Sequence, residues 1–123
     1  MDANSDDFGR RMFSGALVLR GHLSIHRWRQ FLLACTEAMG MSPAGPPAQW
    51  EYPTGGGKGG TGHTICQPIT ESFLALDTWP DHDGAYLFIA SCRKWSQMQL
   101  VEPINLFGLS VENVQQPTTL RLG

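Results

Sequence analysis

The sequence predicts a two-layer α+β sandwich, in which an antiparallel sheet carries two helices on one of its faces. Three observations lead to this fold class. Short apolar runs alternate as strands do, turns rich in glycine and proline separate them, and two segments have helical spacing. Because a chain of 123 residues has the size of one domain, we assign residues 1–12 to a flexible leader and residues 13–123 to a single domain.

The composition excludes several classes of protein. The chain is 41% hydrophobic and 16% charged, with 14 glycines and 8 prolines, which favours a compact sheet protein over a coiled coil or a disordered tail. A formal net charge of −2 argues against nucleic-acid binding through phosphate neutralisation. No stretch approaches the roughly 20 apolar residues of a membrane span, and the acidic start is unlike a secretory signal.

The cysteines and histidines point to neither disulfides nor a metal. Cys35, Cys66 and Cys92 form no even set and no CxxC pair, so we expect a reducing, cytoplasmic location. The four histidines and three cysteines lack the close spacing of zinc ligands, so no metal is expected. We place Cys35 and Cys66 in the core.

The first half of the chain contains the clearest helix. A buried strand at 16–19 precedes Ser24, a suitable N-cap, and Gly40 stands where the helix would end. Between them, apolar residues recur at steps of three and four and predict a helix over 25–39: Ile25, Trp28, Leu32, Cys35 and Met39.

A proline-rich loop and a glycine-rich loop follow. Four prolines between 41 and 53 predict a loop that leads to a short edge strand at 49–52. The run 55–62 is not a phosphate loop, because Lys58 is followed by Gly59 and no strand-to-helix context is evident. We interpret it as a flexible hairpin loop or a substrate lid.

The second half predicts strands around one further helix. A capping box opens that helix at Ser96, and Pro103 must kink it or start a shorter one before Gly108. A strong turn signal separates the second and third of five strands, which we expect at 63–69, 73–78, 85–90, 109–114 and 118–122.

A hydroxyl and a thiol are expected at one end of the central hairpin. If 73–78 and 85–91 pair around the 79–84 turn, Ser72 and Cys92 lie at the same open end and are candidates for a reactive pair. The alternative is that Ser72 is a turn residue and Cys92 a small buried side chain.

These residues belong to a longer pattern. The stretch 71–81 reads Glu-Ser-Phe-Leu-Ala-Leu-Asp-Thr-Trp-Pro-Asp, and Ser91-Cys92 follows. It resembles the prokaryotic S-adenosylmethionine decarboxylases, whose signature joins a Glu-Ser processing site, Thr-Trp-Pro-acid and a cysteine twenty residues after the serine. The resemblance implies a self-processing enzyme in which Ser72 becomes a pyruvoyl group, Glu71 becomes a new C-terminus and Cys92 is the general acid.

The resemblance also implies substrate-binding residues and an oligomer. Asp81 matches an acidic residue that binds ribose hydroxyls, and Leu74 matches the motif's leucine. Trp79 and Tyr52 are aromatic candidates for contact with the adenine or the sulfonium. The family is typically dimeric, with sites near the interface, so a homodimer or a higher homo-oligomer is expected.

The chain departs from the family at Asp77, where the signature has histidine, and Phe73 replaces a second histidine. An ordinary carboxylate is mostly ionised at neutral pH and only accepts a proton, whereas imidazole also donates one. Asp77 can serve as a base, and its charge favours a cationic substrate, either a sulfonium or a basic amino acid. His82, near the 77–81 segment, is a candidate replacement for the imidazole.

A second local likeness lies at 21–28, where His22 and His26 flank Leu-Ser-Ile as in the same signature. Gly21 stands at its nucleophile position and the segment runs into the predicted helix. We therefore assign both histidines to the surface or to the helix start.

Three hypotheses about function remain open. The first is pyruvoyl-dependent decarboxylation of S-adenosylmethionine, which supplies spermidine and polyamine biosynthesis, or of a basic amino acid. The second is a non-processing homologue that binds S-adenosylmethionine or a related nucleoside, as a regulatory partner or with different lyase chemistry. The third is a structural or assembly module. The sequence leaves open whether the Glu71–Ser72 bond is cleaved.

Overall fold

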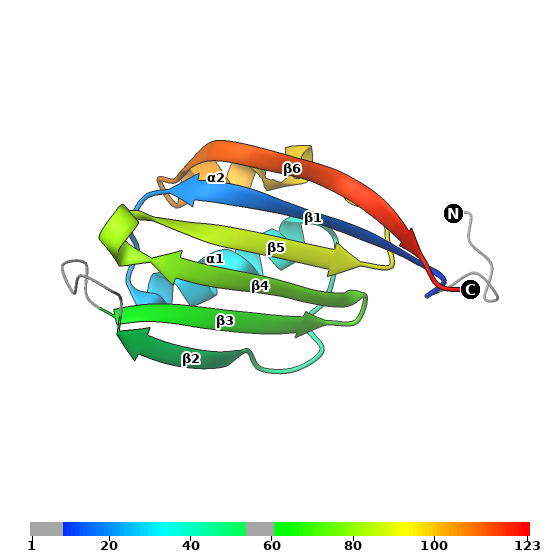
Figure 1. Ribbon diagram of the computed structural model, residues 1–123, viewed down its shortest axis with the longest axis horizontal. Coiled ribbons are helices and arrows are strands. Elements are labelled where there is room, and N and C mark those ends of the chain that lie inside the picture. Colours follow the sequence, from blue (N-terminus) through cyan, green and yellow to red (C-terminus); the bar gives the residue numbers. More distant parts are fainter. Residues whose placement is uncertain (1–8, 54–60) are drawn as a thin grey trace.

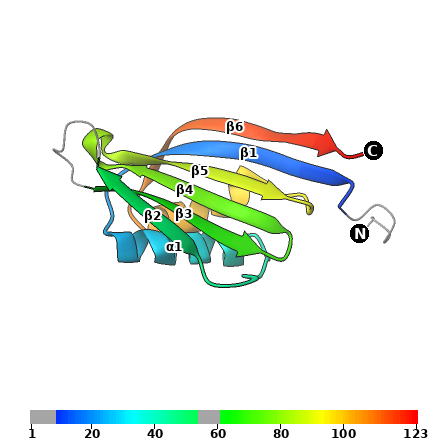
Figure 2. The ribbon, with the colours of Figure 1, turned by 60° about the horizontal axis from the view of Figure 1, so that its bottom comes forward.

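The computed structural model describes residues 9–53 and 61–123 and confirms the predicted fold class. Six antiparallel strands form one sheet in the order β2-β3-β4-β5-β1-β6, with both helices on one face (Figures 1 and 2). The strands are β1 (Arg11–Arg20), β2 (Ala48–Pro53), β3 (Thr61–Ile69), β4 (Ser72–Trp79), β5 (Gly84–Ser91) and β6 (Ser110–Arg121). The helical elements are α1 (Ile25–Ala38), η1 (Pro80–His82), η2 (Gln97–Leu100) and α2 (Val101–Leu106).

Helix α1 begins and ends where the sequence predicts. The Ser24 side chain accepts a hydrogen bond from the Arg27 N–H at 3.2 Å, which satisfies one of the free donors at the helix start. At the other end Gly40 has a φ of 71°, a conformation that glycine adopts without strain. Its N–H donates to the Glu37 carbonyl at 2.9 Å.

The second helical segment starts with the predicted capping box. Ser96 accepts from the Met98 N–H, while the Gln99 side chain accepts from the Ser96 N–H at 2.8 Å. The segment begins as the 3-10 turn η2 and continues as the short helix α2, in which Pro103 is the third residue. The first residues of a helix have no intrahelical partner for their N–H, so proline is tolerated there.

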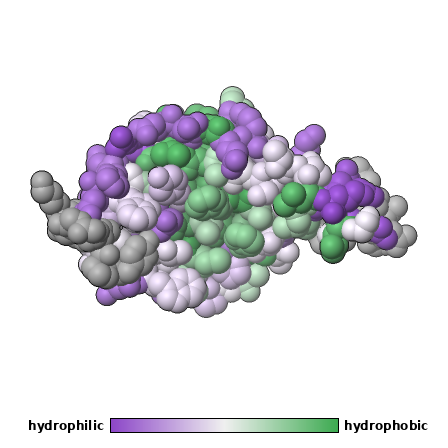
Figure 3. Space-filling model, in the orientation of Figure 1, coloured by the Kyte–Doolittle hydropathy of each residue, from purple (hydrophilic) through white to green (hydrophobic). Residues whose placement is uncertain are grey.

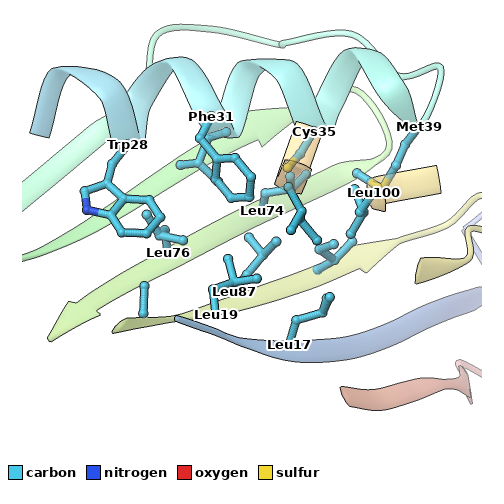
Figure 4. Packing of buried hydrophobic residues seen from close by; sticks show 14 of the residues in the cluster. Leu17, Leu19, Trp28, Phe31, Cys35, Met39, Leu74, Leu76, Leu87 and Leu100 are labelled. Carbon is cyan, nitrogen blue, oxygen red and sulfur yellow. The ribbon is translucent and has the colours of Figure 1, made fainter. Parts of the chain in front are cut away.

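The core lies between the helices and one face of the sheet. Alternate residues of the central strands point toward α1 and are buried, while their neighbours point to the opposite face. Figure 4 shows the leucines of the sheet meeting the side chains of α1. The largest fully buried side chains of the core include Phe31, Leu17, Leu19, Leu74, Leu76, Leu87 and Leu100.

Three expectations about the elements need correction or remain outside the structure. Strand β1 begins at Arg11, so it includes two residues that we assigned to the leader. The segments 109–114 and 118–122 form one strand, β6, whose pairing with β1 shifts register twice. Pro117 lies within the first of these shifts, where no residue of β1 pairs with it, and an edge strand tolerates proline at such a position. Most of the glycine-rich loop, at 54–60, lies outside the described residues.

The opposite face of the sheet carries apolar side chains that neither helix of the described ranges covers. Figure 3 shows hydrophobic residues gathered over the centre of this face. Four aromatic side chains are exposed on the sheet: Trp50 by 58%, Phe73 by 40%, Tyr86 by 44% and Phe88 by 45%. Tyr86 and Phe88 stack with their ring centroids 6.4 Å apart. We call this surface the open face.

Within the described ranges, neither helix has the length and apolar character needed to traverse a lipid bilayer.

Candidate functional site

The β4–β5 hairpin brings Ser72 and Cys92 to the same end of the sheet. Its register pairs Ser72 directly with Ser91, and the Cys92 backbone N–H donates to the Glu71 carbonyl at 3.0 Å. Cys92 therefore stands across from Glu71, one position away from the serine. We call the group formed by Glu71, Ser72, Ser91, Cys92 and Arg93 the Ser72 cluster.

Ser72 has an uncommon backbone conformation. Its φ of 150° lies in the region that side chains other than glycine rarely enter. Residues held in such sparsely populated regions cost of order 1–3 kcal/mol and persist only where the surrounding structure enforces them. The strain falls on the residue that follows the Glu71–Ser72 peptide bond.

The Glu71 carboxylate is fixed by two donors. Its side chain is only 12% exposed, and Arg93 forms an ion pair with it through Nη1 and Oε2 at 3.3 Å. The Thr70 hydroxyl donates to Oε1 at 2.9 Å. The same Nη1 of Arg93 also donates to the Gly40 carbonyl at 3.2 Å, so the turn at 70–71 is tied to the end of α1.

The environment of Cys92 favours the protonated thiol. Burial raises the pKa of Cys92, and the negative charge of Glu71 raises it further. A hydrogen bond from its own backbone and the charge of Arg93 act in the opposite direction and are weaker. At neutral pH the sulfur therefore carries a proton that it can give away.

The sequence identifies no role for Arg93, and it names Ser91 only as the neighbour of the motif's cysteine. The Ser91 hydroxyl is fully buried, donates to the Met41 sulfur at 3.6 Å and accepts from the Arg93 N–H at 2.9 Å. Only the motif's Ser91-Cys92 pair pointed to this strand end. Arg93 meets Glu71 across the hairpin, a long-range pairing that no local pattern encodes.

A second group surrounds Asp77 at the other end of β4. The Thr64 hydroxyl donates to Oδ1 of Asp77 and the Trp79 indole N–H donates to Oδ2, each at 3.0 Å. Tyr86 is the direct cross-strand partner of Asp77 on the open face. We call these four residues the Asp77 cluster. At a rise of about 3.3 Å per residue, Asp77 lies about 16 Å along β4 from Ser72.

The neighbourhood of the Asp77 cluster contains His82 and a shallow pocket. The His82 and Trp79 rings lie 6.2 Å apart, and His82 is exposed in η1. A pocket of about 100 Å³ is lined by both rings and by Tyr86. Asp81 is half-buried in η1, next in sequence to His82. The Asp81 carboxyl, the His82 imidazole and the two aromatic rings that line the pocket thus gather at the same end of the sheet as Asp77.

Two predicted positions differ from the structure, and one lies outside it. Leu74 has no exposed surface and packs under α1, because it occupies a helix-facing position of β4; a ligand cannot reach it there. Cys66 is half-buried opposite Ala75 on the open face, where we expected a core residue. The Tyr52 backbone pairs with Gly62, but its side chain is outside the described part of the chain.

The second local likeness, at 21–28, has a packing explanation. A Cβ at Gly21 would come within 2.6 Å of the Leu109 side chain, and the φ of 134° also requires glycine. His22 is exposed as predicted, and with Trp28 and His63 it lines a cavity of about 200 Å³ at the start of α1. Among the described residues, no three potential ligands from His, Cys, Asp or Glu are grouped to hold a metal ion.

Comparisons with known proteins identify the fold. No protein-family model matches the chain, and no curated protein matches its sequence. The chain is similar to the crystal structure of the adenosylmethionine decarboxylase from Aquifex aeolicus VF5, with a TM-score of 0.57 over 92% of this chain and 89% of that one. The chain thus has the α+β sandwich fold of that decarboxylase. Since the two sequences are only 13% identical, the likeness extends to the fold alone.

Proposed function

We propose that the chain is a self-processing, pyruvoyl-dependent decarboxylase whose substrate is S-adenosylmethionine or a basic amino acid. One observation carries the proposal. The carbonyl that a serine nucleophile would attack, that of Glu71, accepts a backbone hydrogen bond from Cys92, and the serine beside it has a strained φ. The likeness in fold to a decarboxylase supports the same proposed function.

The self-processing step uses residues of the Ser72 cluster. The Ser72 hydroxyl adds to the Glu71 carbonyl carbon and gives its proton to a base; the C–N bond then breaks, leaving an ester and a free amine. Loss of the Ser72 α-proton expels the Glu71 carboxylate, and water replaces the amine nitrogen, which leaves as ammonia. Residues 1–71 then end in a carboxylate, and residues 72–123 begin with a ketone.

The backbone geometry assists the first step in two ways. Negative charge develops on the Glu71 carbonyl oxygen as the hydroxyl adds, and a preorganised N–H donor stabilises such charge. Strain at Ser72 raises the energy of the intact peptide and is relieved when the bond is broken. Both features are present before any reaction occurs.

The protonation state of Cys92 suits the role of general acid. The ketone supplies an electron sink for the loss of CO₂, and the substrate carbon must then regain a proton. Cys92 lies one position from Ser72 across the hairpin, and its raised pKa keeps the thiol protonated at neutral pH.

The separation of the two clusters supports a homodimer. Asp77 lies too far along β4 to accept the Ser72 proton within one protomer, yet it faces outward on the open face. A two-fold axis parallel to the sheet and across the strands would place the Ser72 end of one copy over the Asp77 end of the other. The exposed aromatic residues of the open face supply apolar area for that contact.

The Asp77 cluster favours a cationic substrate. The Thr64 hydroxyl and the Trp79 indole N–H, which donate to the Asp77 carboxylate, are neutral groups. Trp79 and Tyr86 add ring faces that attract cations. A sulfonium and a side-chain ammonium both meet these requirements.

Mass measurement of the purified chain tests the proposal. We expect two fragments, residues 1–71 and residues 72–123, with the second lacking the ammonia of its terminal serine and reactive toward borohydride. Ser72→Ala should remain one intact chain. An intact wild-type chain contradicts the proposal.

A second candidate is a non-processing protein that binds S-adenosylmethionine or a related nucleoside. The Asp77 carboxylate at the position where the family signature has an imidazole favours it, because an ordinary carboxylate accepts a proton but is a poor donor. It predicts an uncleaved chain whose melting temperature rises with S-adenosylmethionine. Absence of a shift in an uncleaved chain would count against it.

A further inference from the structure

We propose that Arg93 is a positioning residue for self-processing, which holds Glu71 in the geometry that exposes its carbonyl to attack. The inference rests on the proposed function, since it concerns the rate at which the Glu71–Ser72 bond is converted. The sequence gives Arg93 no role, because it lies outside the motif at 71–81 and follows the motif's cysteine.

Arg93 joins three segments that meet at this bond. Its Nη1 donates to the Gly40 carbonyl at 3.2 Å and to Oε2 of Glu71 at 3.3 Å. Its backbone N–H donates to the buried Ser91 hydroxyl at 2.9 Å. The residue therefore connects the end of α1, the β3–β4 turn and the end of β5.

The turn that carries Glu71 has a second anchor beside it. The Thr70 N–H donates to the Ser42 carbonyl at 3.0 Å, and the Thr70 hydroxyl donates to Oε1 of Glu71. Each carboxylate oxygen thus has its own donor. With the side chain held on both sides, the Glu71 carbonyl remains directed at the Cys92 N–H.

Arg93 also acts through charge. As the Ser72 hydroxyl adds, negative charge grows on the Glu71 carbonyl oxygen, in the same residue as a largely buried carboxylate. The developing oxyanion and the carboxylate of Glu71 repel each other, and the ion pair with the Arg93 guanidinium offsets that repulsion. Removing Arg93 leaves the carboxylate uncompensated and frees the turn from α1.

The test follows cleavage in newly synthesised full-length chain, in a cell-free system, by the appearance of residues 1–71 and 72–123. We expect Arg93→Ala to slow cleavage by about tenfold, less than the loss of a direct oxyanion donor. Arg93→Lys should restore most of the rate, because one nitrogen makes both side-chain contacts. Lys94→Ala, which removes the same charge from the adjacent exposed residue, is the matched control and should cleave at the wild-type rate.

A double-mutant comparison separates the effect of the Arg93–Glu71 ion pair from a purely structural role of Arg93. In a Glu71→Gln background, Arg93→Ala should slow cleavage much less than it does in the wild-type chain. In an uncleavable Ser72→Ala chain, Arg93→Ala should move the alkylation profile of Cys92 to higher pH, because Arg93 lowers the pKa of that thiol.

The outcomes are distinguishable. Wild-type cleavage with an equally fast Arg93→Ala overturns the inference and leaves the proposed function intact. Equal slowing in both Glu71 backgrounds, without rescue by lysine, also overturns it, since that pattern indicates structural support alone. No cleavage of the wild-type chain overturns the proposed function and this inference together.

Discussion

Ser72 combines a reactive side chain with a backbone that serine adopts at a cost. The φ of 150° is accessible to glycine without a Cβ penalty. Ser72→Gly should therefore be more stable than Ser72→Ala by about 1 kcal/mol, although glycine also gains entropy in the unfolded chain. Chemical denaturation of the two uncleavable variants measures the difference. A glycine variant less stable than the alanine variant would show that the position carries no strain.

The charge of Glu71 contributes, after burial, to the raised pKa of the neighbouring Cys92 thiol. In an uncleavable Ser72→Ala chain, Glu71→Gln removes one of the two causes that raise the pKa of Cys92, so that pKa should fall. The alkylation rate of Cys92, followed by peptide mass spectrometry, should then rise at lower pH than in the parent. Glu37→Gln, on the exposed side of α1, is the control and should leave the profile in place. An unchanged profile in Glu71→Gln would contradict the coupling.

Local patterns predicted the elements well where a single segment decides the structure. The spacing of Trp28 and Cys35 with a cap at Ser24 defined α1, and alternation with a turn defined the β4–β5 hairpin. The motif drew attention to Ser72 and Cys92. It could not indicate Arg93, whose partners lie 22 and 53 residues away.

Errors arose where the outcome depends on which face or partner an element meets. Leu74 lies in the motif, but it alternates along β4 with the exposed Phe73 and therefore points under α1. Thr64 was missed because its partner Asp77 lies on the adjacent strand. The two final segments became one strand because β1 pairs along both of them.

The start of α1 depends on one side chain that can be tested at the scale of the element. Ser24→Ala should lower the free energy of unfolding by about 1 kcal/mol, because the Arg27 N–H loses its acceptor. Thermal or urea denaturation measures this loss. Ser42→Ala, whose backbone carbonyl rather than its hydroxyl makes the contact with Thr70, is the control and should change stability much less. Equal stability of Ser24→Ala and wild type would show that the Ser24 side chain does not stabilise α1.

The whole molecule presents an apolar sheet face to its surroundings. If a second copy covers this face, Phe88→Asp should shift the protein from dimer to monomer, because a carboxylate would be buried among aromatic rings. Sedimentation velocity measures the change. Leu33→Asp, on the exposed side of α1, is the control and should leave the assembly unaltered. A wild-type chain that is monomeric at all accessible concentrations would contradict the dimer.

The placement of Ser72 and Asp77 at opposite ends of β4 has a genetic consequence. In the dimer proposed above, Ser72→Ala and Asp77→Ala chains are each inert, yet a mixed pair contains one pocket with both native residues and one with neither. Co-expression of the two should therefore rescue function in trans, at about a quarter of the native sites if the chains pair at random. Complementation between two dead alleles would reveal that each reaction centre is shared.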